Sequence, residues 1–182
     1  MKNDNKILKI LAAGAVLATM HLSAHAVDSV SAEYAFGSNV QVVRLGAQWD
    51  WSQRWFASNG NHIGGYWDLS LGQWRGDKYR NIDGEHQNIT SIGITPVFRW
   101  QKDSKKGFYA EAGVGAHLMS ETYNNADNRI ATAFTFGDHV GIGYVFNNKL
   151  DLGLKYQHFS NGGIKKPNSG VNMTVLHASY HF

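Results

Sequence analysis

The sequence predicts an all-β fold, an eight-stranded antiparallel transmembrane β-barrel of a bacterial outer membrane. Three observations support this prediction. The chain starts with the layout of a secretory signal peptide, alternates apolar and polar residues along most of its remaining length, and ends on the aromatic residue Phe182. Aromatic residues form 13% of the chain and only 2 of its 182 residues are proline, a composition typical of strands.

Residues 1–26 are expected to be a signal peptide that is removed on export. Three lysines lie among the first nine residues, residues 7–20 are largely apolar, and Ala24-His25-Ala26 forms a small-x-small cleavage site. A membrane-anchoring helix is the alternative, but a helical span needs about 20 apolar residues and this run is shorter. We therefore expect cleavage after Ala26 and a single barrel domain over residues 27–182.

The composition of the remaining chain excludes several classes of function. Without residues 1–26 the chain carries 14 basic and 13 acidic residues, so its net charge of +1 does not indicate a nucleic-acid partner. The absence of cysteine excludes disulfides and thiol chemistry. The 9 histidines show no spacing typical of metal ligands, so we expect no metal and no cofactor.

Eight segments alternate with the period of a strand, in which successive side chains point to opposite faces. The expected strands are residues 29–36, 40–51, 62–74, 88–101, 108–122, 132–146, 150–160 and 172–182. A soluble β-sandwich would alternate in the same way. The membrane barrel is favoured because aromatic residues gather near the strand ends on the apolar face, as in an interfacial girdle. The other face is rich in glycine and carries Arg99, Glu111 and Lys155, which suits a narrow polar lumen.

An even number of strands places both termini on the periplasmic side of the membrane. The outer loops are then residues 37–39, 75–87, 123–131 and 161–171. The seventh expected strand consequently runs outward and ends where the last outer loop begins.

A histidine and a serine stand at that outer end, two residues apart on one strand. His158 and Ser160 therefore point to the same face, and parity with Leu154 and Tyr156 makes it the lipid-facing one. A polar pair at the hydrocarbon boundary is costly without a function, and a histidine beside a serine can act as its base. The segment His177-Ala178-Ser179 has the same spacing but points into the lumen, where we expect ordinary hydrogen bonding.

Two residues are candidates for the group that orients the histidine. Asp138 has lipid-facing parity on the sixth strand, and a three-residue turn at 147–149 would place it directly opposite His158. Asn172, at the start of the eighth strand, has the same parity and is the neighbour on the other side. Asp138 could equally be a structural acid that is bonded to backbone or loop groups.

The stretch from His158 to Gly170 resembles the lipid A 3-O-deacylase family (PagL), and the resemblance extends over nearly the whole chain after the signal peptide. Further matches are Trp49-Asp50-Trp51, Gly65-Tyr66-Trp67-Asp68, Pro96-Val97-Phe98, Glu111-Ala112-Gly113-Val114-Gly115 and Asp138. The resemblance implies an eight-stranded outer-membrane barrel that hydrolyses the 3-position acyl ester of lipid A. It also implies that Ser160 is the nucleophile and His158 the base, and that Asn161, the Gly163 backbone and Asn168 hold or build the oxyanion site.

The sequence departs from the family pattern at one catalytic position. The family often has glutamate twelve residues after the serine, where this chain has Asn172. An asparagine carbonyl can fix a histidine tautomer, as in Cys-His-Asn enzymes, but it supplies no full negative charge. The third residue of the catalytic triad is therefore open. It is Asp138 or Asn172, or the enzyme works with a Ser-His pair that needs no third residue.

The expected partners are lipid A or lipopolysaccharide as substrate and the surrounding outer-membrane lipids, and a homodimer is compatible with this architecture. Basic residues in the outer loops would lie near lipid A phosphates and core-sugar charges, or would simply be solvated. These residues are Arg75, Lys78, Arg80, Arg129, Lys165 and Lys166. Two alternatives remain: a non-enzymatic barrel with an adhesive or structural role, and a different outer-membrane lipid enzyme such as a phospholipase or acyltransferase.

Overall fold

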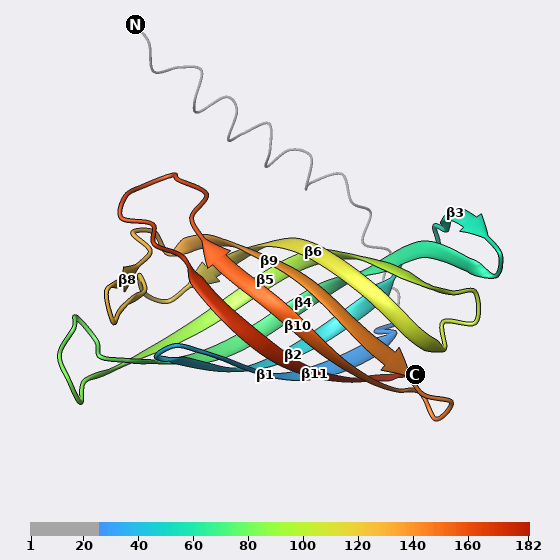
Figure 1. The fold of residues 1–182 in the computed structure, drawn as a ribbon, viewed down its shortest axis with the longest axis horizontal. Helices are drawn as coiled ribbons and strands as arrows, with labels where there is room; N and C mark the ends of the chain where they lie inside the picture. The colour runs from blue at the N-terminus through green and yellow to red at the C-terminus, as the bar shows by residue number, and fades with distance from the viewer. Residues whose placement is uncertain (1–25) are drawn as a thin grey trace, which may run out of the picture.

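Eight long antiparallel strands close into a barrel in the computed structural model, which describes residues 26–182 (Figure 1). These strands are β1 (Ser29–Gly37), β2 (Val40–Asp50), β4 (Asn61–Asp77), β5 (His86–Lys102), β6 (Gly107–Met119), β9 (Phe134–Val145), β10 (Leu150–Ser160) and β11 (Val171–His181). Each pairs with the next one along the chain, and the pairing of β1 with β11 closes the barrel. The predicted fold class is therefore confirmed, with strand ends displaced by only a few residues.

Within residues 26–182 no helix is long and apolar enough to cross a membrane. The predicted signal peptide falls almost wholly outside the described residues, so the cleavage site stays a prediction.

Three short strands were not expected from the sequence. β3 (Trp55–Ser58) pairs with the start of β4, whereas β7 (Asn124–Asn125) and β8 (Asn128–Arg129) form a small hairpin in the loop between β6 and β9. The hairpin turns at two residues with positive φ, Ala126 and Asp127, as a tight two-residue turn requires. Segments this short carry no measurable periodicity, which explains why they were missed.

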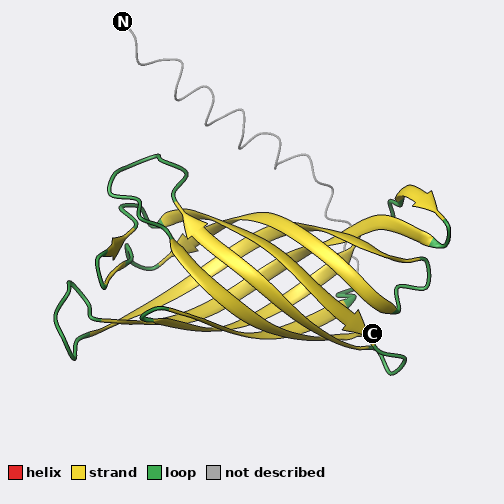
Figure 2. Ribbon diagram, in the orientation of Figure 1, coloured by secondary structure: helices red, strands yellow, loops and turns green. Residues whose placement is uncertain are grey.

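The strands are strongly tilted, and the long loops gather at one end of the barrel, opposite the C-terminus (Figure 2). Lipid-facing side chains are apolar and well exposed, as for Leu45 at 60% and Ile142 at 65%. The alternate side chains fill the interior with paired charges. Arg99 lies 2.7 Å from Glu111 and 2.9 Å from Asp151, and Lys155 lies 3.0 Å from Glu111. The predicted polar lumen is thus a closed network of ion pairs.

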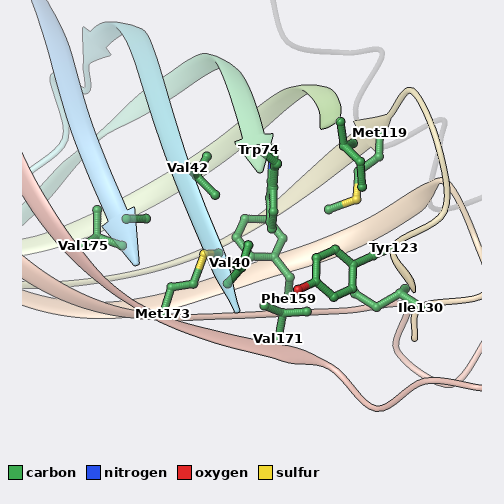
Figure 3. Packing of buried hydrophobic residues seen from close by; sticks show 12 residues of the cluster. Val40, Val42, Trp74, Met119, Tyr123, Ile130, Phe159, Val171, Met173 and Val175 are labelled. Atoms are coloured by element: carbon green, nitrogen blue, oxygen red, sulfur yellow. The ribbon is translucent and has the colours of Figure 1, made fainter. Parts of the chain in front are cut away.

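Near the loop end the interior changes from charged to apolar. Phe159 is fully buried there, and its ring centroid lies 4.8 Å from that of the buried Trp74. Figure 3 shows Val171, Tyr123 and Ile130 around this pair. Phe159 points inward from β10, so its two neighbours on the strand must point outward. This apolar packing fixes the orientation of His158 and Ser160.

Candidate active site

The imidazole of His158 is held by the neighbouring strand. His158 pairs with Asn172 across β10 and β11, and the distance between His158 Nδ1 and Asn172 Oδ1 is 2.7 Å. An amide oxygen accepts hydrogen bonds only, so it requires the proton on Nδ1 and leaves Nε2 as a lone-pair acceptor. The ring is therefore in the tautomer that a general base needs.

Ser160 lies on the same outward face, two residues nearer the loop end. Its side chain is half-buried, and its Oγ accepts a long hydrogen bond of 3.3 Å from the backbone N–H of Gly162. Residues 26–182 contain no hydrogen bond between Ser160 and His158. Such bonds are often loose without substrate and tighten in the reactive complex, so the shared face and spacing are the informative observations.

Asn161 and Asn168 form the framework of the loop that follows Ser160. Asn161 is fully buried: its N–H donates to Asn168 Oδ1 at 2.9 Å and its Nδ2 donates to the carbonyl of Lys165 at 2.6 Å. Its Oδ1 accepts the N–H of Gly163 at 3.0 Å. These hydrogen bonds hold the loop in place after Ser160.

Gly162 is the residue that sequence reasoning missed. Its N–H donates a hydrogen bond to Ser160 Oγ, whereas the N–H of Gly163, the expected donor, is engaged by Asn161. Both glycines have positive φ, 62° and 79°, which a side chain would strain. Two consecutive glycines in the sequence indicate a turn at this position, but only the folded turn shows which of the two amides faces the serine.

The loop after β10 is also tied to the loop between β6 and β9. Ala131 donates its N–H to the carbonyl of Pro167 at 3.0 Å, and Ser169 donates to the carbonyl of Arg129 at 2.9 Å. Gly170 then places its backbone directly against the imidazole, because a Cβ built there would lie 2.4 Å from His158 Cε1. The backbone of this loop therefore confines the histidine ring on one side.

Asp138 lies where the strand register predicted but makes no hydrogen bond or ion pair with the histidine. It pairs with His158 across β9 and β10 and is half-buried on the outward face. Its carboxylate has no hydrogen bond or ion pair within the described part of the chain. In this geometry Asn172, and not Asp138, orients His158.

A groove of about 410 Å³ runs along the barrel wall from this point. His158 and Asp138 line it on β10 and β9, and the rest of its wall is mainly apolar. The apolar and aromatic residues that line it are Pro96, Phe98, Ala112, Val114, Val140 and Tyr156. We call this feature the wall groove. It opens to the lipid-facing surface, so a lipid chain can enter it sideways from the bilayer.

The remaining residues that the sequence singled out make no hydrogen bond with His158 or Ser160 in the part of the chain that the structure describes. His177, in the second His-x-Ser segment, points into the lumen with Nδ1 2.8 Å from Glu33 Oε1, as expected for ordinary hydrogen bonding. Among the basic loop residues, Lys78 pairs with Asp83 at 2.8 Å and Arg80 stacks on the ring of Tyr79. Arg129 and Lys165 belong to the tied loops beside Ser160.

Comparison with known proteins agrees with this geometry. A family profile described as Lipid A 3-O-deacylase (PagL) matches residues 41–181. The lipid A deacylase PagL of Bordetella bronchiseptica is 37% identical over 158 residues, covering 84% of this chain and 83% of that protein. The lipid A deacylase PagL of Pseudomonas aeruginosa is 34% identical over 172 residues, covering 94% and 96%.

A solved structure described as the outer membrane enzyme PagL superposes with a TM-score of 0.74 at 29% identity, covering 85% of this chain and 99% of that one. The family match extends over most of the chain and includes every residue of the candidate site. This chain is therefore an outer-membrane β-barrel that belongs to the lipid A 3-O-deacylase (PagL) family.

Proposed function

We propose that the protein is an esterase of the outer membrane that removes the 3-position acyl chain of lipid A by a serine-histidine mechanism without a cofactor. Family membership supports the substrate and reaction class. The single structural observation that carries the mechanism is the 2.7 Å contact between His158 and Asn172 on the lipid-facing surface, beside Ser160.

In the proposed reaction, Ser160 Oγ attacks the acyl carbonyl carbon while His158 Nε2 takes the hydroxyl proton. The tetrahedral intermediate collapses as the imidazolium returns that proton to the leaving sugar oxygen. Water, deprotonated by the same Nε2, then hydrolyses the acyl-enzyme and releases the fatty acid. Asn172 keeps the ring in its reactive tautomer throughout, although it adds a dipole and not a full charge.

The negative oxygen of the intermediate needs a hydrogen-bond donor near Ser160. The N–H of Gly162 makes only a 3.3 Å hydrogen bond with the serine oxygen, so it can turn to a bound oxyanion at little cost. Asn161, Gly163 and Asn168 support this donor by holding the loop, which is a positioning role.

The placement of the site explains how a membrane lipid reaches it. His158 and Ser160 lie at the outer end of β10 on the lipid-facing surface, where the ester bonds of outer-leaflet lipids are expected. The wall groove extends from His158 across the lipid-facing side of β9, β6 and β5 and is open to the bilayer. The basic residues Arg129 and Lys165 on the neighbouring loops suit the phosphates of lipid A at the membrane surface. A homodimer stays a prediction.

Mass spectrometry of lipid A after exposure to the folded protein tests this proposal. The wild type should release one acyl chain, and Ser160→Ala and His158→Ala should each abolish the release. Because both side chains act on one step, the double variant should lose no more than either single variant. Ser179→Ala is the matched control, since it alters the second His-x-Ser segment inside the lumen.

Three outcomes would overturn the proposal. Near-normal release by folded Ser160→Ala would exclude the serine mechanism. Hydrolysis of phospholipids with intact lipid A would indicate a phospholipase. Unchanged lipid A and phospholipids in the presence of folded wild-type protein would indicate a non-enzymatic barrel.

A further inference from the structure

Three of the outer loops are joined into one hydrogen-bonded layer at the rim of the barrel. The hairpin of β7 and β8 lies at the centre of this layer, at the end that carries the long loops (Figure 1). On one side, Tyr79 forms an antiparallel bridge with Asn125 of β7. On the other side, Ile130, directly after β8, forms an antiparallel bridge with Asn168. We call this layer the rim sheet, which comprises residues 78–80, 123–126, 128–131 and 167–169.

One end of the rim sheet reaches the active site. Asn168 Oδ1 accepts the N–H of Asn161 at 2.9 Å, and Asn161 directly follows Ser160 in the chain. The next residue is Gly162, whose N–H donates to Ser160 Oγ at 3.3 Å. The position of this proposed oxyanion donor therefore depends on the position of Asn168, and so on the position of β8.

A side-chain clamp fastens the opposite end of the rim sheet. Asn81 Oδ1 accepts the backbone N–H of Asp127 at 2.6 Å, and Asn81 Nδ2 donates to the carboxylate of Asp127. Asp127 lies at the tip of the hairpin of β7 and β8, in the turn between the two strands. One side chain from the loop between β4 and β5 thus holds both the backbone and the side chain of the hairpin tip.

We propose that Asn81 is a positioning residue for the esterase reaction, acting on the active-site loop through the rim sheet. This inference rests on the proposed esterase function. An antiparallel ladder shifts as a unit, because its hydrogen bonds have narrow limits of distance and angle. A hairpin that is released at its tip moves Asn168, and with it the amide of Gly162, relative to Ser160. A misplacement of about 1 Å at reacting groups can cost up to about a hundredfold in rate.

The burial of the hairpin base limits the size of this effect. Tyr123 is 1% and Ile130 is 0% exposed, and both belong to the apolar cluster around Phe159. Release of the tip therefore tilts the hairpin about its base and does not detach it. Asn81 and Asp127 are both exposed, so the clamp adds little to the closure of the barrel. We expect a loss well below a hundredfold, in kcat and not in KM, since the lipid-facing surface is unchanged.

The test measures kcat and KM for acyl release from lipid A in detergent micelles by the full folded protein. Asn81→Gly removes the clamp and tolerates the φ of 65° at this position, and it should lower kcat by about threefold to tenfold. KM and the urea midpoint of unfolding should stay at their wild-type values. Asp83→Asn is the matched control, because it weakens an ion pair of the same loop, with Lys78 at 2.8 Å, and leaves the clamp in place.

An exchange of the two clamp residues tests the contact itself. Asn81→Asp alone sets two carboxylates against each other and should be as slow as Asn81→Gly. Asn81→Asp combined with Asp127→Asn restores a donor opposite an acceptor, and it should recover most of the wild-type kcat. Recovery in the double variant would show that the hydrogen bonds of the clamp carry the effect.

Several results would overturn the inference. Wild-type kcat in folded Asn81→Gly would remove the positioning role, and a raised KM with unchanged kcat would mean that this loop meets lipid A directly. A lowered urea midpoint that accounts for the lost activity would make the clamp a structural contact of the barrel. A double variant no faster than Asn81→Asp would separate the clamp from the effect, and this comparison decides if Asn81→Gly does not fold. Absence of acyl release by folded wild-type protein would defeat the proposed function, a result distinct from equal release by wild type and variant.

Discussion

Asn172 offers the most informative perturbation of the site, because within the described residues its side chain makes the one hydrogen bond to the His158 imidazole. Asn172→Ala removes the acceptor that lies 2.7 Å from His158 Nδ1. A hydrogen bond to a group that becomes charged is worth about 1.5–3 kcal/mol. Since each 1.36 kcal/mol of barrier is tenfold in rate, kcat/KM should fall by about tenfold to a hundredfold. The exposed position of Asn172 favours the lower end of this range.

Asn172→Glu separates orientation from charge. A carboxylate at the same position accepts the same hydrogen bond and adds attraction to the imidazolium, about 4 kcal/mol at 4 Å and an effective dielectric constant of 20. Desolvation offsets most of that attraction, so we expect activity equal to the wild type or raised by up to about tenfold. Loss of activity in the glutamate variant would show that neutral asparagine is specifically required.

The assay is the kcat/KM for acyl release from lipid A in detergent micelles, followed by mass spectrometry, with heat-modifiable migration in gel electrophoresis as the check of folding. Thr174→Ala is the matched control. Thr174 is the next residue on the lipid-facing side of β11 after Asn172, and it pairs with Tyr156 rather than with His158. Wild-type kcat/KM in Asn172→Ala would refute the reasoning. The enzyme would then work as a Ser-His pair, or another group such as Asp138 would orient the ring.

Three further predictions concern the loop, the lumen and the N-terminus. Gly170→Ala should lower activity by about tenfold or more while the barrel still assembles. The new Cβ would lie 2.4 Å from His158 Cε1, and residue 170 has a φ of 73°, which strains any residue other than glycine. Activity equal to that of the wild type would contradict this prediction. Glu111→Gln should lower the free energy of unfolding in urea by about 3–5 kcal/mol, because it leaves buried Arg99 and Lys155 underpaired, and an unchanged urea midpoint would show that the lumen network is dispensable. The exported protein should begin at Val27, and N-terminal sequencing that finds Lys2 retained would contradict the signal peptide.

The sequence by itself determined the strands and the faces of their side chains. Period-two alternation is a local property of consecutive residues, and it fixes which side chains share a face wherever one side of a strand meets lipid and the other does not. It therefore placed His158, Ser160, Asp138 and Asn172 on one surface. The short turn at 147–149, confirmed by the hydrogen bond between Phe146 N and Leu150 O, also fixed the register that sets Asp138 opposite His158.

Only the tertiary structure decided which of the two neighbours of His158 makes the contact. Asp138 and Asn172 occupy equivalent register positions on either side of β10, so parity and register cannot separate them. The choice depends on the direction of the side chains and on the loop backbone packed against the ring at Gly170. The same holds for Gly162, because adjacent glycines in a turn point their amides in different directions that a sequence pattern does not record.

The contacts that hold the site together also could not be predicted from the sequence. Trp74 packs on Phe159 from a strand far away along the chain, and the loop at 129–131 binds the loop at 167–169. Such pairings arise from the tilt and closure of the barrel, which bring distant strand ends to one rim. Local alternation specifies that a residue points inward, whereas the partner it meets there is set by the geometry of the whole closed sheet.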